Sequence, residues 1–323
     1  MNKGILIGIL GGFLLISACG TSDKQATNGS DKQQDEDYFQ PEELPEAVSY
    51  ERTEAIYKQT SASFQDSISI EELEEAIISF NEGVDSYTLE SQIPIEGMDY
   101  YTWIDETETR GISAAFDEND IIHYFYIPIM ETFPETDKQM TETEFILPIN
   151  EEWFTWWGGT NELVNYHYVV EEQRYAYDFL MRENNQSYSG DPTKNESYYS
   201  FGKEVIAPAS GTVVEIESKI EDNEPVGEMN EKEPFGNYVI IDHGNDEYSL
   251  IAHLKRESVE VAVGDTVSQG DIVGLNGNSG HSSEPHIHFQ VNDSPDFFNS
   301  KSINIQFKDD VRPTRGDVIQ SQL

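Results

Sequence analysis

The sequence predicts a small α+β domain followed by an all-β domain, the second built on a folded antiparallel sheet. Three observations indicate this. The length of 323 residues suits about two domains. Between residues 50 and 127, helix-type spacing of apolar residues is followed by short alternating segments. From about residue 145 to residue 307, short β-type segments alternate with glycine turns and no long amphipathic helix interrupts them.

The N-terminus has the pattern of an export signal. Lys3 precedes an apolar run, Ile5 to Ile16, that is shorter than the roughly 20 residues needed to span a bilayer. Ser17-Ala18-Cys19-Gly20 follows and resembles the bacterial lipobox, whose cysteine is lipidated and becomes the new N-terminus. Cys19 is the only cysteine, and a free buried thiol is the alternative. We expect a signal peptide over 1–18, a lipid on Cys19 and an extracytoplasmic protein anchored to the membrane of a Gram-positive cell.

The composition limits the possible partners. With 37% hydrophobic and 11% aromatic residues the chain can build packed cores. The formal net charge is −43, from 19 basic and 62 acidic residues. This charge repels phosphate backbones, so no nucleic acid is expected as a partner. Its plainest explanation is solubility outside the cell. We expect contact with the membrane through the N-terminal lipid only.

The segment after the lipobox is polar and leads into the first domain. Residues 19–46 are rich in serine, aspartate, glutamine and glycine, which predicts a flexible linker after Cys19. Residues 47–140 then form a small α+β accessory domain. A helix is expected from about residue 50 to 64, and Ser69 to Glu72 is a capping box that opens a second helix. Strands are expected at 87–95, 100–104, 112–116 and 121–127.

This domain resembles, in pattern only, the cystatin-like and nuclear-transport-factor-2-like modules that precede wall hydrolases in some lipoproteins. Its one histidine, His123, lies among apolar residues and is interpreted as a packed or edge residue rather than a ligand. Residues 141–310 form the all-β domain, in which 205–214 and 263–274 are strand–turn–strand units with glycines at the corners. Residues 311–323 are expected to be a frayed polar tail.

Four histidines of the all-β domain stand in patterns that carry chemistry. His286 and His288 are two apart on an expected strand, so both face one side while Ile287 and Phe289 face the core. Two solvated surface histidines would give the same pattern. His253 also follows an expected strand. Together with His286, it would supply an imidazole that takes a proton from water or stabilises a developing oxyanion.

His167 and Asp178 complete a possible metal site. If 166–170 and 175–179 are the strands of one hairpin, these two residues lie opposite one another, with Cβ atoms about 4.5–5.5 Å apart. A charged cross-strand pair is the simpler alternative. With His288 as a third ligand, the set suits one Zn²⁺ per chain, and a fourth position stays open for water. Since no thiolate is available, softer ions are disfavoured.

Several further motifs of the all-β domain occur in a fixed order. They are Ala207-Pro208-Ala209-Ser210-Gly211-Thr212-Val213, Ala252-His253-Leu254, Val263-Gly264-Asp265-Thr266-Val267 and Pro285-His286-Ile287-His288-Phe289. Over roughly half of the chain, this order resembles the lysostaphin-type (LytM-like) zinc metallopeptidases, the twenty-third metallopeptidase family. The resemblance implies the lysostaphin-type fold with its duplicated hybrid motif, and peptidoglycan as substrate. It also implies metal ligation by His167, Asp178 and His288 and catalysis by His253 and His286.

Three positions depart from the pattern of that family. Ten residues separate His167 from Asp178, where three are usual. Ile251 stands where a tyrosine is common, and Glu284 where a glycine is common. Two other functions remain possible. One is a non-hydrolytic module of the same fold that binds the wall or activates other hydrolases. The other is a biotinyl or lipoyl carrier, which is disfavoured because no lysine lies between residues 263 and 289.

Overall fold

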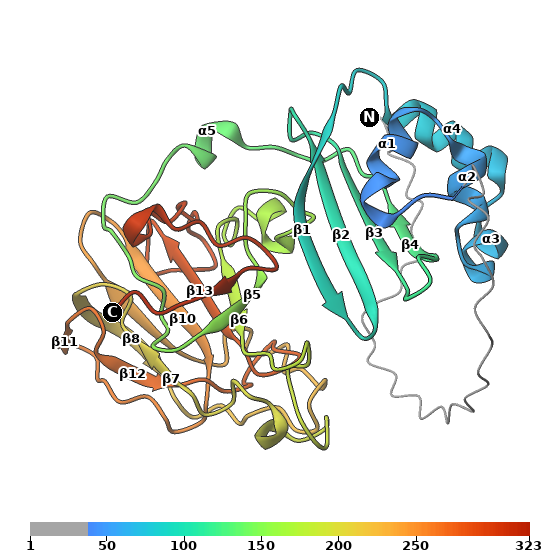
Figure 1. The fold of residues 1–323 in the computed structure, drawn as a ribbon. Coiled ribbons are helices and arrows are strands. Elements are labelled where there is room, and N and C mark those ends of the chain that lie inside the picture. The colour runs from blue at the N-terminus through green and yellow to red at the C-terminus, as the bar shows by residue number, and fades with distance from the viewer. Residues whose placement is uncertain (1–37) are drawn as a thin grey trace. The chain divides into compact units, whose positions relative to one another are not determined.

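The structure, a computed structural model, describes residues 38–323. The predicted signal peptide, Cys19 and most of the predicted linker lie outside the described residues. Over residues 38–323, no helix is both long and apolar enough to cross a membrane. The described chain divides into two compact units (Figure 1). Unit 1 contains residues 38–92 and 97–129, and unit 2 contains residues 93–96 and 130–323.

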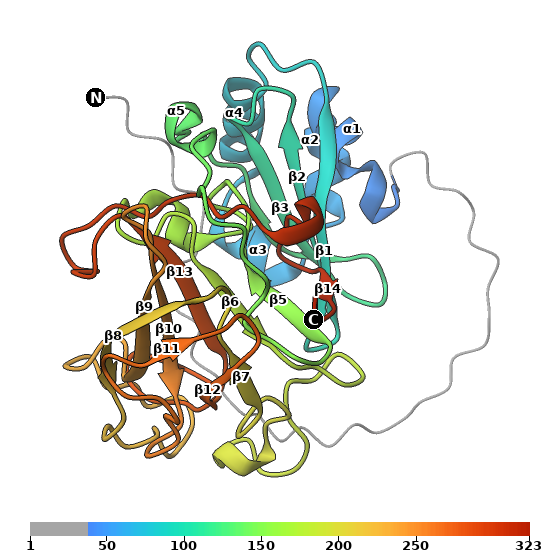
Figure 2. The same ribbon diagram turned by 90° about the vertical axis from the view of Figure 1, so that its left-hand side faces the viewer.

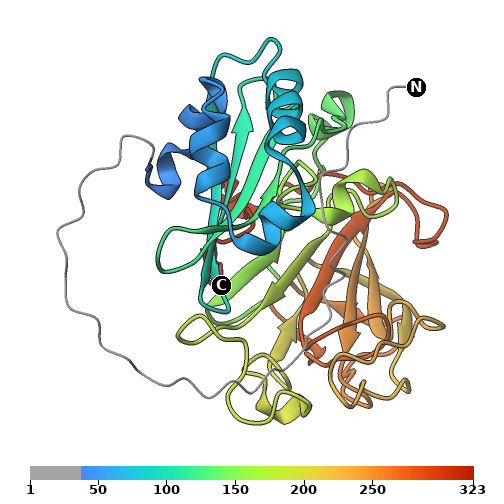
Figure 3. The same cartoon turned by 90° about the vertical axis from the view of Figure 1, so that its right-hand side faces the viewer.

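Unit 1 is a four-stranded antiparallel sheet with helices on one face, as Figure 3 shows. The strands run in the order β1-β2-β3-β4 and are Tyr87–Ile95, Met98–Asp105, Gly111–Phe116 and Ile122–Tyr126. The helices are η1 (Pro41–Glu43), α1 (Leu44–Ser49), α2 (Thr53–Lys58), α3 (Ala62–Ser67) and α4 (Ile70–Phe80). The capping box is present, since the Ser69 hydroxyl accepts the Glu72 N–H and the Glu72 carboxylate accepts the Ser69 N–H. The α+β class and the four expected strands are confirmed.

Two details of unit 1 differ from the sequence-based expectation. Helical structure begins at Pro41, inside the predicted 19–46 linker, because Phe39 and Leu44 are buried in the core of unit 1. The expected helix over 50–64 is instead two short helices, α2 and α3. They are separated where Thr60 forms a bridge to Ile122 and the Ser61 N–H donates to the Ile122 carbonyl. At this point, the hydrogen bond to the edge strand of the sheet is more favourable than a further turn of helix.

Unit 2 is mostly antiparallel β structure (Figure 2). Its large sheet has the order β11-β8-β9-β10-β13-β6-β5-β14, and a second sheet pairs β12 with β7. The strands of the large sheet are β5 (Trp153–Trp157), β6 (Tyr177–Leu180), β8 (Gly211–Glu217), β9 (Asn237–Asp242), β10 (Tyr248–Leu254), β11 (Thr266–Val267), β13 (Ile287–Asn292) and β14 (Val318–Ile319). Those of the second sheet are β7 (Glu204–Ile206) and β12 (Ile272–Leu275). The short helical elements are α5 (Pro134–Asp137), η2 (Tyr166–Val169), η3 (Asn195–Ser197) and η4 (Lys308–Asp310). The all-β class is confirmed.

The central strands of the large sheet separate a core face from a polar face. Ile251, Ile287 and Phe289 point into the main hydrophobic core of unit 2. Their neighbours His288 and Gln290 therefore point to the opposite face of β13. The burial of alternate apolar side chains thus holds these two residues on one face of the sheet.

Two further segments of unit 2 differ from the sequence-based expectation. The predicted tail 311–323 contains β14, which pairs with β5 and buries Ile319. Residues 130–140, assigned by sequence to the accessory domain, lie in unit 2. The acidic segment 217–234 is tied to the strand-connecting loop before β13. There the buried Asn223 amide donates to the carbonyls of Gly280 and Ser282 at 2.8 and 2.9 Å.

Candidate metal and catalytic site

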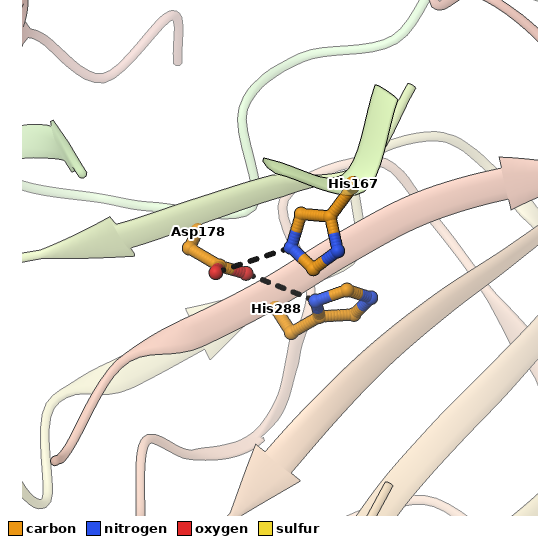
Figure 4. A group of neighbouring side chains, drawn as sticks. All are labelled: His167, Asp178 and His288. Carbon is orange, nitrogen blue, oxygen red and sulfur yellow. Dashed lines mark hydrogen bonds and ion pairs between the residues drawn. The ribbon is translucent and has the colours of Figure 1, made fainter. Parts of the chain in front are cut away.

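A carboxylate and two imidazoles converge on the polar face of the large sheet. Asp178 on β6 and His288 on β13 are directly opposed cross-strand partners. The Asp178 Oδ1 atom lies 2.9 Å from His288 Nδ1, and its Oδ2 atom lies 3.2 Å from His167 Nε2 (Figure 4). One ligand atom from each of the three residues lies within 4.8 Å of the others. All three side chains are buried, with 2–4% of each residue exposed. The structure therefore brings together the three residues that the sequence selected.

The backbone route to His167 differs from the expected hairpin. His167 lies in η2 and not on a strand, and the residue paired with Asp178 across the sheet is His288. Asn165 caps η2, because its side-chain oxygen accepts the His167 N–H at 3.2 Å. The Asn165 amide also donates to the carbonyls of Arg174 and Ala176, which return toward β6. A compact turn, and not a pair of hydrogen-bonded strands, therefore brings His167 close to Asp178 across the ten intervening residues.

Two glutamines that the sequence analysis did not select hold the ligand imidazoles. The Gln173 side-chain oxygen lies 3.0 Å from His167 Nδ1, and that of Gln290 lies 2.7 Å from His288 Nε2. Since an amide oxygen accepts only, each contact places a proton on that ring nitrogen. The opposite nitrogen of each ring is the one beside Asp178, and it can ligate a metal when it carries no proton. Gln290 could have been found from sequence, since it follows His288 by two residues on one strand face.

Removing the Gln290 contact should weaken metal binding. We expect Gln290→Leu to lower zinc affinity about 10- to 100-fold, because His288 loses the partner that fixes its tautomer and ring orientation. Competition with a chromogenic chelator measures this. Gln290→Glu keeps an acceptor and is expected to retain most of the affinity. Equal affinity in Gln290→Leu and the unmodified chain would mean that the contact does not orient the ring.

The electrostatics of the site favour a charged Asp178. Burial by itself would raise the pKa of Asp178, but His167, His286 and the hydrogen bonds from His167 and His288 bring it well below its usual range. Burial by itself would lower the pKa of His288, but the Asp178 carboxylate prevails and raises it. A buried anion surrounded by imidazoles is an arrangement that a divalent cation stabilises.

His253 reaches the site through a bulge in β10. The pairing of β10 with β9 shifts register between Ile251 and Leu254, and His253 lies within the shift with φ at 63°. Leu254 consequently returns to the core, while the His253 ring lies 5.7 Å from the His288 ring and 4.8 Å from the His286 ring. A bulge thus turns toward the site a side chain that regular alternation would place in the core. The sequence indicated the residue but not the bulge.

His253 and His286 are each held by a backbone carbonyl. His253 Nδ1 lies 2.9 Å from the Ser279 carbonyl, and His286 Nδ1 lies 2.8 Å from the Glu284 carbonyl. These contacts place the protons on Nδ1 and leave Nε2 of each ring as the acceptor. His286 Nε2 is 3.8 Å from Asp178 Oδ1. Burial lowers the pKa of both residues, well below the usual range for His253. Both imidazoles are therefore neutral bases at physiological pH.

The remaining histidines lie outside this group. His123 in unit 1 is paired with Asp117 at 3.0 Å, and the exposed His281 precedes β13 in a loop. His243 contacts the Ser210 carbonyl and the Ser249 hydroxyl at 2.9 and 2.8 Å, which is a structural role.

Glu284, the residue found where the resembled family commonly has glycine, is predicted to make stability depend on pH. Burial raises its pKa, against the opposing effects of the Ser187 hydroxyl at 2.6 Å and of Arg182. The folded state then holds this proton to higher pH than the unfolded state, so stability falls as pH rises through that interval. Glu284→Gln should remove this loss. Thermal unfolding should show a gain for Glu284→Gln at pH 8 that shrinks toward pH 4. A gain independent of pH would contradict the assignment.

Part of unit 2 is similar to known peptidases. Residues 197–305 match the model of the family described as "Peptidase family M23". The matched segment contains His253, His286 and His288. His167 and Asp178 precede it, so their place in the site depends on the structure alone.

Curated relatives are similar to part of this chain. "Endolysin 2638A" of Staphylococcus phage 2638A is 36% identical over 97 residues, 29% of this chain and 17% of the relative. "Peptidoglycan DD-endopeptidase ShyA" of Vibrio cholerae is 39% identical over 64 residues, 20% of this chain and 14% of the relative. The chain thus spans less than a fifth of the length of the curated relatives it matches. Among solved structures, the lysostaphin catalytic domain from Staphylococcus simulans is 25% identical, with 39% of this chain and 73% of that chain covered and a TM-score of 0.25.

Proposed function

We propose that the chain is a zinc-dependent endopeptidase that hydrolyses peptide bonds of bacterial peptidoglycan, in the stem peptide or the cross-bridge. The observation that carries this proposal is the convergence of His167, Asp178 and His288 beside two neutral imidazoles. Two relatives support the substrate, because one is named a peptidoglycan endopeptidase and another an endolysin.

The donor set fits zinc. Two imidazole nitrogens and one carboxylate oxygen are ligand types that catalytic zinc sites use. All three side chains are buried, which limits competition from water for the metal. Gln173 and Gln290 orient the two imidazoles for ligation. A zinc ion held by these residues would supply Lewis-acid activation of water and of the scissile carbonyl.

The chain's own residues would manage the proton and the charge of the reaction. Nε2 of His253, with Nδ1 fixed on the Ser279 carbonyl, can accept the proton that the attacking water loses. His286 is held in the same way by the Glu284 carbonyl, so its Nε2 is also an acceptor. Once it has taken up a proton that the water loses, it can transfer that proton to the leaving amine or donate it in a hydrogen bond to the developing oxyanion. Burial of the group excludes bulk water and strengthens each of these contacts.

We also propose that the protein is anchored to the outside of the cell membrane. Lipidation of Cys19 would tether unit 2 to the outer face of the membrane, within reach of the wall. The lipobox pattern supports this. Cys19→Ser should release the protein from the membrane fraction into the medium or leave it unprocessed, as gel migration and cell fractionation would show.

Digestion of purified peptidoglycan tests the enzymatic activity. Mass spectrometry of the products is expected to show new amino termini within the stem peptide or cross-bridge, and no cleavage of the glycan chain. Activity should disappear on chelation and return with added zinc. Wall fragments that stay intact with the zinc-loaded protein would refute the proposal and favour a module that binds the wall.

A further inference from the structure

An aromatic pocket lies beside the candidate active site on the large sheet of unit 2. It encloses about 290 Å³ and is lined by Glu215, Phe235, Tyr238, Ile240, Pro295, Asp296, Phe297 and Phe298. Tyr238 and Ile240 belong to β9, and Pro295 to Phe298 belong to the loop that follows β13. We call the cavity lined by these eight residues the aromatic pocket.

The loop after β13 presents a phenyl ring to solvent. Phe298 is 62% exposed, although its ring centroid lies 4.9 Å from that of Phe235. The loop is fixed at its tip, since the Asp296 carboxylate accepts the Phe298 N–H at 3.3 Å and the Asn299 amide at 3.0 Å. Phe297 is buried against the sheet beneath it. Phe298 therefore forms an exposed edge of the pocket above the buried rings of Phe235 and Phe297.

The register of the strands places the aromatic pocket on the same sheet face as the metal-site candidates. Leu250 on β10 is paired with Gln290 on β13 and with Ile240 on β9. From β13 to β9 is two interstrand spacings, about 10 Å, which an extended peptide crosses in about three residues. The Phe235 carbonyl accepts the His253 N–H at 3.0 Å, so one wall of the pocket adjoins the site.

The charge at the pocket is negative. Glu215 is paired with Ile240 across the sheet, and its exposed carboxylate accepts the Tyr238 hydroxyl at 2.6 Å. Asp296 adds a second carboxylate, largely occupied by its own loop. Over the described residues, no lysine or arginine lines the pocket. Aromatic faces and a carboxylate together suit an alkyl chain that ends in a cation.

We infer that the aromatic pocket is a substrate subsite for an aliphatic ammonium group, carried on a side chain about three residues from the scissile bond. This inference rests on the proposed peptidase function for its substrate. The alkyl part of the side chain lies against Phe235 and Phe298, and the ammonium lies between the Tyr238 ring and the Glu215 carboxylate. A cation in that place gains both a cation–π contact and an ion pair.

A binding experiment tests the chemistry of the pocket without catalysis. Hexylammonium, hexanol and hexanoate are titrated separately into the isotope-labelled protein and followed by nuclear magnetic resonance. Hexylammonium should shift the Tyr238 and Phe298 signals and bind about fivefold more tightly than hexanol, and hexanoate should not bind. Glu215→Gln should abolish the preference, whereas the exposed control Glu260→Gln should keep it. Equal binding of hexanol and hexylammonium, or no shift at all, would overturn the inference.

A cleavage experiment tests the link to the substrate. Soluble wall peptides are compared with the same peptides after acetylation of their amines, which removes the positive charge. The unmodified protein should cleave the acetylated set about fivefold more slowly, and Glu215→Gln should cleave the two sets equally. Phe298→Ala should weaken the preference, and Val263→Ala, at another exposed apolar residue, should not. If both sets are cleaved equally by the unmodified protein, the subsite is wrong but the peptidase stands. If neither set is cleaved, the proposed function fails, and the binding experiment alone tests whether the pocket binds an ammonium group.

Discussion

Replacing Asp178 with asparagine should abolish both stoichiometric zinc binding and wall hydrolysis. Asp178 contacts both imidazoles of the candidate site, and its low pKa makes it the one fixed anion among them. Asparagine keeps the size but removes the charge that a divalent ion needs. We expect zinc content near zero by elemental analysis, and hydrolysis reduced to background.

Glu247→Gln is a matched control for Asp178→Asn. Glu247 is also a buried carboxylate of unit 2, but it accepts the backbone N–H groups of Glu142 and Thr143 and lies outside the candidate site. This variant should retain zinc even if its stability falls. Full hydrolysis by Asp178→Asn would refute the site, and loss of zinc from both variants would point to general unfolding.

Replacing His253 should separate catalysis from metal binding. His253 lies beside the three ligand candidates without contacting Asp178 within hydrogen-bond distance. His253→Ala should therefore keep one zinc per chain while hydrolysis falls about 100- to 10,000-fold, the usual contribution of a general acid or base. His123→Ala, at the histidine of unit 1, should leave hydrolysis unchanged. Loss of zinc in His253→Ala would instead indicate that His253 is a metal ligand.

The bulge at His253 also leads to a prediction about stability. His253 has a φ of 63°, which glycine adopts without strain and alanine does not. His253→Gly and His253→Ala should lose activity alike, yet the glycine variant should be more stable by about 1 kcal/mol. Denaturant unfolding measures this difference. A less stable glycine variant would contradict a strained bulge.

Sequence patterns predicted the elements of the fold that depend on local chemistry. The capping box at Ser69 and the alternating strands of unit 1 follow from hydrogen-bond and burial rules that act within a few residues. The start at Pro41, the break at Thr60 and the pairing of Ile319 could not be predicted in this way. Each depends on a partner distant in the chain, such as Ile122 for Thr60 and Trp153 for Ile319.

The candidate site was predictable in its residues but not in its geometry. Alternation placed His288 on the polar face, and the structure agrees. The hairpin proposed for His167 was wrong, although its consequence, a close His167–Asp178 pair, holds. The turn depends on Asn165 bonding to carbonyls nine and eleven residues later. Residue spacing carries no signal for such contacts, or for the bulge that redirects His253.

X-ray diffraction at the zinc absorption edge, on crystals of the purified chain, tests the central claim most directly. The predicted result is a single anomalous peak per chain, about 2.0–2.2 Å from His167 Nε2, a carboxylate oxygen of Asp178 and His288 Nδ1. A peak bound by other residues, or a protein grown with zinc that shows no peak at these three atoms, would contradict the claim.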